Sequence, residues 1–195
     1  STAATIVFLA IFMIFLLFLS GWFSGSETAI TNLSPSDIAR MKRTGYKSTD
    51  YIIKLKKNMG KTLITILIGN NIVNIILSTV GALVANALFA KIGVTVMVGI
   101  LSFLVIVFGE ITPKNSAIHD SMKIASRNAR WIYLLSLILT PLVIMFSFVS
   151  KKLIRLVGGK ERSEHLLTSD DPIKDLASLF EEEGNIKPIE REIIH

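Results

Sequence analysis

The feature that most constrains the fold is the absence of charged residues from four long stretches of the chain. No charge precedes Glu27, and none lies within residues 62–90, 92–109 or 131–150. A helix needs about 20 apolar residues to cross the hydrocarbon core of a bilayer. Four such stretches are too much apolar sequence to bury inside one globule of 195 residues. The sequence therefore predicts an all-α integral membrane protein whose main partner is the lipid bilayer.

Basic residues indicate how the chain crosses the membrane, because cytoplasmic loops are enriched in Lys and Arg. None precedes Arg40, and eight lie between Arg40 and Lys61. We expect three spans, at about residues 3–31, 61–90 and 94–113. The N-terminus would lie outside the cell and the C-terminus in the cytoplasm, in a multi-pass protein of the plasma membrane.

Two further segments are predicted to lie at the inner membrane surface. The first, residues 35–58, mixes apolar residues with lysines as amphipathic surface helices do. Ser34 is suited to cap its first helix; the alternative is a solvated basic loop. The second, residues 129–157, is basic at both ends and interrupted by Pro141, which breaks a helix. We expect a kinked inner-leaflet helix there rather than a fourth span.

The charge balance changes near residue 160. Residues 1–160 form the predicted transmembrane domain, whereas residues 161–195 are rich in Asp and Glu. We expect this acidic segment to form short cytosolic helices that lead to a C-terminal regulatory domain absent from this chain. The net charge of +6 does not indicate nucleic acid, because the basic residues flank apolar stretches, where an anionic membrane surface attracts them.

Each predicted span carries polar residues that are costly in hydrocarbon. Ser20 and Ser24 are four residues apart and share one helix face. Asn70 and Asn74 share a face of the second span, and Glu110 directly follows the apolar run of the third. Serines can also be packing residues that bond back to their own helix, and a membrane asparagine can join two helices. Three asparagines within five residues favour a binding role.

Pro113 interrupts the backbone hydrogen bonds at the end of the third span. It has no N–H, so in an α-helix the carbonyl four residues earlier, that of Gly109, loses its partner. We expect that carbonyl to be free beside the Glu110 carboxylate, as broken membrane helices present carbonyls to ions. The alternative is a simple helix end at which Glu110 extends toward Lys114.

Depth brings the three groups together. At about 1.5 Å per residue, antiparallel spans place them at one level in the cytoplasmic half of the membrane. The predicted site has six oxygen ligands, from Ser20, Ser24, Asn70, Asn74, Gly109 and Glu110. Such a set suits Mg²⁺ or Ca²⁺, and a single carboxylate also allows Na⁺. No nitrogen or sulfur ligand is offered, which argues against zinc and copper.

The motifs Ser20–Ala29, Gly69–Asn74 and Phe108–Lys114 resemble the transmembrane domain of the cyclin M/CorC family of magnesium transporters in order and spacing. The resemblance implies a prokaryotic plasma-membrane homodimer that exports Mg²⁺, in exchange for Na⁺. It places the ion site on the six residues above and adds Gly69. It also implies that nucleotide binds only to cytosolic domains that follow this chain.

A secondary transporter is the leading functional hypothesis. The alternative is a membrane-embedded cation sensor or scaffold that regulates a partner and transports nothing itself. A channel would show a ring of carbonyls or a hydrophobic gate, and the sequence shows neither. An enzyme is not expected, because a serine nucleophile needs a nearby base and all three histidines lie outside the predicted spans.

Overall fold

The computed structural model describes residues 2–156, apart from the side chains of residues 2, 89–94 and 155, and this part of the chain is built of helices without strands. The acidic segment expected at residues 161–195 lies outside the described residues. Three helices are long and apolar enough to cross a membrane: Ala3–Asn32, Met59–Leu88 and Thr95–His119. The all-α membrane fold is therefore confirmed, with three candidate spanning helices. The bent pair of helices within residues 121–154 is also long and apolar enough, taken together, to be a broken span.

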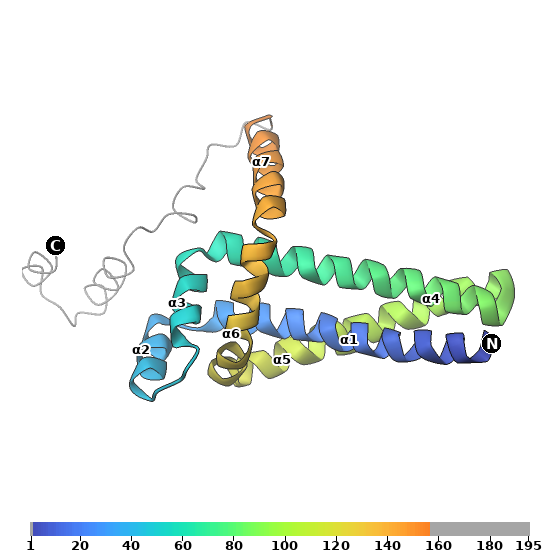
Figure 1. Cartoon of the computed structure of the whole chain (residues 1–195), viewed down its shortest axis with the longest axis horizontal. Helices are drawn as coiled ribbons and strands as arrows, with labels where there is room; N and C mark the ends of the chain where they lie inside the picture. Colours follow the sequence, from blue (N-terminus) through green and yellow to red (C-terminus); the bar gives the residue numbers. More distant parts are fainter. Residues whose placement is uncertain (1, 157–195) are drawn as a thin grey trace, which may run out of the picture.

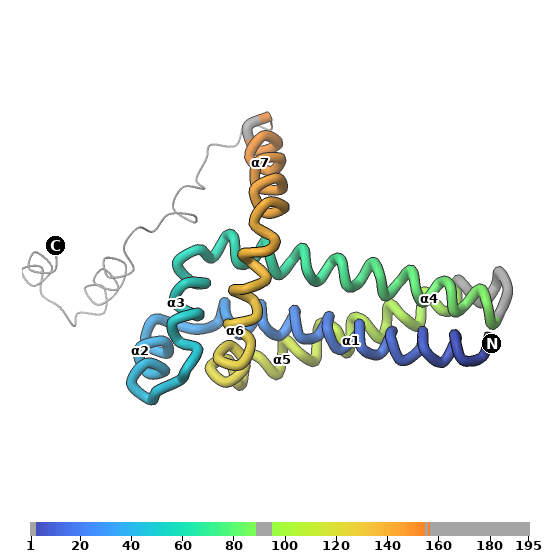
Figure 2. The backbone as a smooth tube through the Cα atoms, in the orientation of Figure 1, coloured from blue at the N-terminus to red at the C-terminus, as the bar shows by residue number. Residues whose placement is uncertain are grey.

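The spans are built from four helical elements, α1, α4, η1 and α5. The first is α1 (Thr2–Asn32), and α4 (Met59–Leu104) contains the second span and the start of the third. Figures 1 and 2 show the chain turning back within α4, so that its two arms run antiparallel. The third span continues through η1 (Val105–Ile111) and α5 (Thr112–His119), past Pro113, where the sequence predicted its end.

Close packing between the arms of α4 is visible at Gly81. A Cβ atom added to Gly81 would clash with Cδ1 of Leu101, which lies in the other arm. The side chains of Leu77, Val84 and Ala85 are buried on the same arm. Because a membrane gives no hydrophobic drive for helices to associate, such close approach at small residues is what holds spans together.

Two short helices follow α1 at the basic end of the bundle: α2 (Pro35–Arg43) and α3 (Thr49–Lys57). The segment predicted to be amphipathic is thus helical and not a loop. Ser34 and Asp37 form a capping box, in which the Asp37 N–H donates to Ser34 Oγ (3.1 Å) and the Ser34 N–H to Asp37 Oδ2 (3.0 Å). Lys56 donates to the Thr31 carbonyl near the end of α1 (3.1 Å).

The remaining pair, α6 (Ser121–Ile138) and α7 (Thr140–Leu156), is bent by 72°. The bend falls at Leu139, and Pro141 opens α7, where its missing N–H removes no helix bond. Figure 1 shows α6 running across the end of the bundle and α7 projecting from it.

The hydrophobic core lies where α6 crosses the spans. Ala125, Ala129 and Ile132 of α6 are fully buried, as are Ala29 and Ile30 of α1. Alanines on both helices let the two backbones approach closely. The basic end of the bundle is therefore a packed layer. It holds the C-terminal half of α1 in place, and this half carries Ser20 and Ser24 of the predicted site.

Candidate cation site

Glycines on α1 allow the third span to lie directly against it. A Cβ added to Gly21 would come within 3.0 Å of both the Phe108 carbonyl oxygen and Cγ of Pro113. One added to Gly25 would lie 3.4 Å from the Pro113 carbonyl oxygen. Without side chains at these positions, the α1 backbone can pack on the Pro113 ring. This close contact brings the polar face of α1 to the η1 segment.

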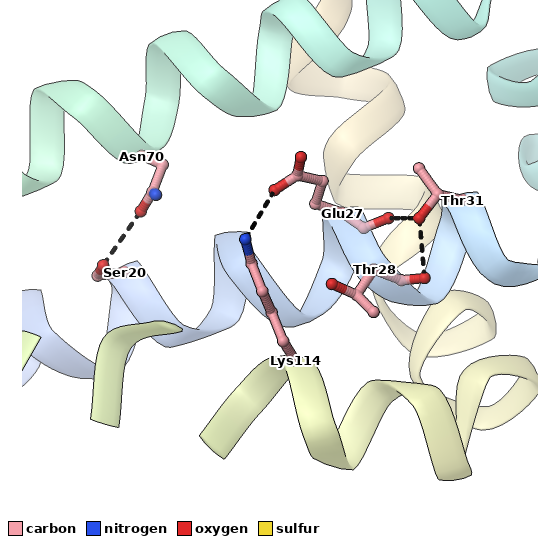
Figure 3. A network of polar contacts seen from close by, with 6 residues as sticks. All are labelled: Ser20, Glu27, Thr28, Thr31, Asn70 and Lys114. Carbon is pink, nitrogen blue, oxygen red and sulfur yellow. Dashed lines mark hydrogen bonds and ion pairs between the residues drawn. The ribbon is translucent and has the colours of Figure 1, made fainter. Parts of the chain in front are cut away.

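Ser20 joins all three spans. Its side chain is fully buried, and Oγ donates to Oδ1 of Asn70 on α4 at 3.1 Å (Figure 3). On the other side, a Cβ added to Gly109 would lie 3.0 Å from the same Oγ. The oxygen atoms of Ser20 and Asn70 and the backbone of Gly109 therefore meet, as the sequence predicted for these three positions.

Ser24 and Asn74 have polar atoms that are buried and unpaired. Ser24 is 1% exposed, and neither its Oγ nor Asn74 Oδ1 has a hydrogen-bond partner within the part of the chain described. Such an atom costs about 1–3 kcal/mol. Nearby Ser26 shows the usual solution, because its Oγ donates to the Trp22 carbonyl (2.6 Å) and accepts from Asn128 Nδ2 (2.8 Å).

A missing partner of this kind calls for an explanation, such as a water or an ion. Asn74 also borders a cavity of about 260 Å³ between the two arms of α4, which Ser78 and Ser102 line as well. Neither serine was among the residues predicted from the sequence, since isolated serines in an apolar run carry no distinguishing pattern. Asn74 Oδ1 and this cavity lie on α4, the helix that carries Asn70, whereas Ser24 Oγ lies on α1.

The carbonyl freed by Pro113 is not the one expected. In η1 the Thr112 N–H donates to the Val107 carbonyl, five residues back, which is the π-helical spacing. In this register the bond that Pro113 cannot make belongs to Phe108 rather than Gly109. The Phe108 carbonyl instead faces Gly21 of α1. The α-helical count was wrong here because the proline is accommodated by a local π segment.

Glu110 does not pair with Lys114, which was the alternative partner expected for it. Lys114 pairs with Glu27 of α1 (3.9 Å), and both side chains are partly exposed (Figure 3). The Glu110 side chain is half-buried. Among the described residues no group of three His, Cys, Asp or Glu side chains is close enough to hold a metal. A cation bound here would thus rely on neutral oxygens and one carboxylate.

Gly69 has a packing role in the structure. A Cβ at this position would come within 2.6 Å of Cε1 and Cζ of Phe23, whose ring is buried. The glycine makes room for this ring between α1 and α4. It lies one residue before Asn70 and so sets how closely the two helices approach at the Ser20–Asn70 contact.

Comparison with known proteins identifies the family. The family model described as the cyclin M transmembrane N-terminal domain matches residues 11–190. The chain belongs to the cyclin M transmembrane domain family. This family is linked to magnesium and divalent-cation handling and is not a known enzyme family. The resemblance stated from the sequence motifs is confirmed.

Relatives of this cyclin M domain occur in bacteria and in plants. The UPF0053 inner membrane protein YfjD of Escherichia coli is 33% identical over 73% of this chain and 33% of its own length. A UPF0053 protein of Haemophilus influenzae is 32% identical over 94% of this chain and 43% of its own length. A chloroplastic DUF21 domain-containing protein of Arabidopsis thaliana is 32% identical over 92% of this chain and 27% of its own length. The cyclin M domain thus spans less than half the length of these relatives.

Proposed function

We propose that this chain is the transmembrane part of a magnesium transporter, in which Mg²⁺ is the cargo. The observation that carries the proposal is that two buried oxygens, Ser24 Oγ and Asn74 Oδ1, have no partner within the described part of the chain. Each lies one turn from the Ser20–Asn70 contact, and because α1 and α4 run antiparallel they lie on opposite sides of it. Oxygen ligands alone suit a hard divalent cation. The link of the family to magnesium handling supports Mg²⁺ as that cation.

The proposed site combines neutral and charged ligands. Ser20, Ser24, Asn70 and Asn74 would supply neutral oxygens, and Glu110 would supply the one negative charge. The carbonyl of Gly109 belongs to the proposed set because this residue packs on Ser20. A single carboxylate neutralises half of the charge of Mg²⁺, so the ion would be bound weakly enough to leave. Weak binding is what a transport site requires.

The proposed direction, coupling and assembly are supported by the charge pattern and by the resemblance of the sequence motifs. The basic helices α2, α3 and α6 gather at one end of the bundle, away from the start of α1 (Figure 1). With that end in the cytoplasm, the N-terminus lies outside the cell. We propose efflux of Mg²⁺ through the plasma membrane, coupled to Na⁺ entry, by a homodimer. Nucleotide would act only through domains outside this chain.

Flux into and out of liposomes tests the proposal. The purified protein is reconstituted with a Mg²⁺-sensitive dye, with and without an opposing Na⁺ gradient. Ser24→Ala, Asn74→Ala and Glu110→Gln are each expected to lower the initial Mg²⁺ flux by roughly 10-fold or more, as loss of groups around a metal does. A Na⁺ gradient is expected to accelerate flux in the wild-type protein.

Ser136→Ala is the matched control for the serine variant. Ser136 is also buried, but its Oγ donates to the Tyr133 carbonyl of its own helix (2.7 Å). Its replacement should leave flux unchanged. If folded wild-type protein moves no Mg²⁺ under any gradient, yet Mg²⁺ raises its thermal midpoint, the transporter proposal is wrong and the sensor alternative stands.

A further inference from the structure

We propose that a groove between α4 and α7 binds an anionic phospholipid of the surrounding membrane, held by Lys61 and Lys151. The groove has a volume of about 350 Å³. Lys61 of α4 forms one side, and the other side is one face of α7. The lining residues of α7 are Thr140, Val143, Ile144, Ser147, Phe148 and Lys151. Their spacing of three or four residues places them in one row along the helix.

The position of the groove points to a lipid. Lys61 lies at the start of the apolar span Met59–Leu88, which is where the hydrocarbon core meets the headgroup layer. Ile144 and Phe148 are 63% and 67% exposed, and Phe146 and Leu153 on the other faces of α7 are also exposed. Figure 1 shows α7 projecting from the bundle. A helix with such exposed apolar faces needs lipid as its solvent.

The charge of the groove selects an anionic headgroup. Among the residues that the structure describes, Lys61 and Lys151 are the charged residues of the groove, and no carboxylate lines it. Within residues 2–156 the structure contains one ion pair, between Lys114 and Glu27. Neither Lys61 nor Lys151 is therefore neutralised by a carboxylate of these residues. Two ammonium groups near the membrane surface attract anionic lipid. A phospholipid whose phosphate lies at the two lysines would place its acyl chains beside Val143, Ile144 and Phe148.

The inference does not depend on ion transport. A bound phospholipid would bridge the start of the second span and the helix that leaves the bundle, and this role stands even if the chain moves no cation. Soluble phosphate would satisfy the lysines and leave the apolar row unused. The occupant is therefore a lipid with phosphate and acyl chains, such as phosphatidylglycerol.

Native mass spectrometry of the delipidated protein tests the site, with dioleoyl phosphatidylglycerol or dioleoyl phosphatidylcholine as the added lipid. The wild-type protein is expected to bind phosphatidylglycerol in preference. The double variant Lys61→Gln/Lys151→Gln should lower that affinity roughly 30-fold, the effect of removing two lysines near anionic lipid. Lys61→Arg/Lys151→Arg should retain binding, which shows that charge at these positions is what matters.

The control is Lys57→Gln/Lys152→Gln, which makes the same change in net charge at neighbouring lysines outside the groove. It should bind phosphatidylglycerol as the wild type does. Equal loss in the control would mean diffuse attraction and overturn the site. Equal affinity for the two lipids would also overturn it, as would unchanged binding in the folded Gln double variant, and a protein surface would then be the occupant of the groove.

Discussion

At the scale of single residues, two buried serines on α1 differ in their hydrogen bonding. Ser24 and Ser26 are both buried, but Ser26 makes two hydrogen bonds and Ser24 Oγ makes none in the described structure. In sequence they look alike, since both are next to Gly25 in the same motif. The difference arises because Ser26 faces α6, where Asn128 donates an amide N–H to it, whereas no described side chain does so for Ser24.

Gly69 gives a prediction about packing at this scale. Gly69→Ala would force its Cβ to within 2.6 Å of the Phe23 ring, which has little space to move because it is 6% exposed. Overpacking of this kind destabilises by about 1–3 kcal/mol. We expect a lower thermal midpoint in detergent. Gly99→Ala is the control, because nothing lies within 4 Å of a Cβ there, and it should be neutral or stabilising. Equal midpoints for the two variants would contradict the packing role.

At the scale of elements, the third span shows how a proline is tolerated in a membrane helix. The π segment Val105–Ile111 shifts the backbone bonds by one residue, and the helix then continues as α5. The carbonyl left without a bond to Pro113 faces Gly21 and is thereby shielded from lipid. The same geometry places Gly109 against Ser20, so the distortion of this helix and the position of the candidate site are connected.

The capping box of α2 gives a pH-dependent prediction. Hydrogen bonds from the Ser34 side chain and backbone, in that order, hold the pKa of Asp37 below its usual value. A carboxyl with a lowered pKa stabilises the fold above the pKa of the unfolded chain, about 3.9, and loses that contribution as the pH falls through its folded value. Asp37→Asn should therefore be less stable than wild type at pH 7, with the difference shrinking below about pH 4.

Thermal midpoints of the two proteins across pH 3–8 measure this effect. Ser34→Ala should also lower the midpoint at pH 7, since loss of a cap residue costs about 1 kcal/mol. Asp50→Asn is the control, because Asp50 lies in the first turn of α3, whose N-cap residue makes no side-chain cap bond. A stability difference between wild type and Asp37→Asn that stays constant with pH would rule out the carboxylate as its source.

At the scale of the whole molecule, α6 ties the basic layer to the first span. Asn128 of α6 is 3% exposed, and its Nδ2 donates to Ser26 Oγ of α1 across 102 residues of sequence. The alanines that flank Asn128 let the two helices approach closely enough for this bond. The bond lies half a turn from Ser24, so the position of α6 is linked to the candidate site.

A double-mutant cycle measures this link. Ser26→Ala leaves the buried Asn128 amide without an acceptor, and we expect destabilisation of about 1–3 kcal/mol. Asn128→Leu removes the amide, so Ser26→Ala should cost much less in that background. The midpoint of the double variant should thus be higher than the sum of the two single reductions predicts. Strictly additive midpoints would show that the two side chains do not interact energetically.

The sequence by itself determined the membrane fold, the three spans and the family, because uncharged stretches long enough to cross a bilayer have no other stable environment. Its motifs also predicted that Ser20, Asn70 and Gly109 meet, since spacing along a helix fixes both face and depth. Only the tertiary structure decided which carbonyl Pro113 leaves free and that Lys114 pairs with Glu27. It also decided that Ser26 has a hydrogen-bond partner while Ser24 has none among residues 2–156. These outcomes depend on which helix lies opposite each side chain, and no local pattern in the chain carries that information.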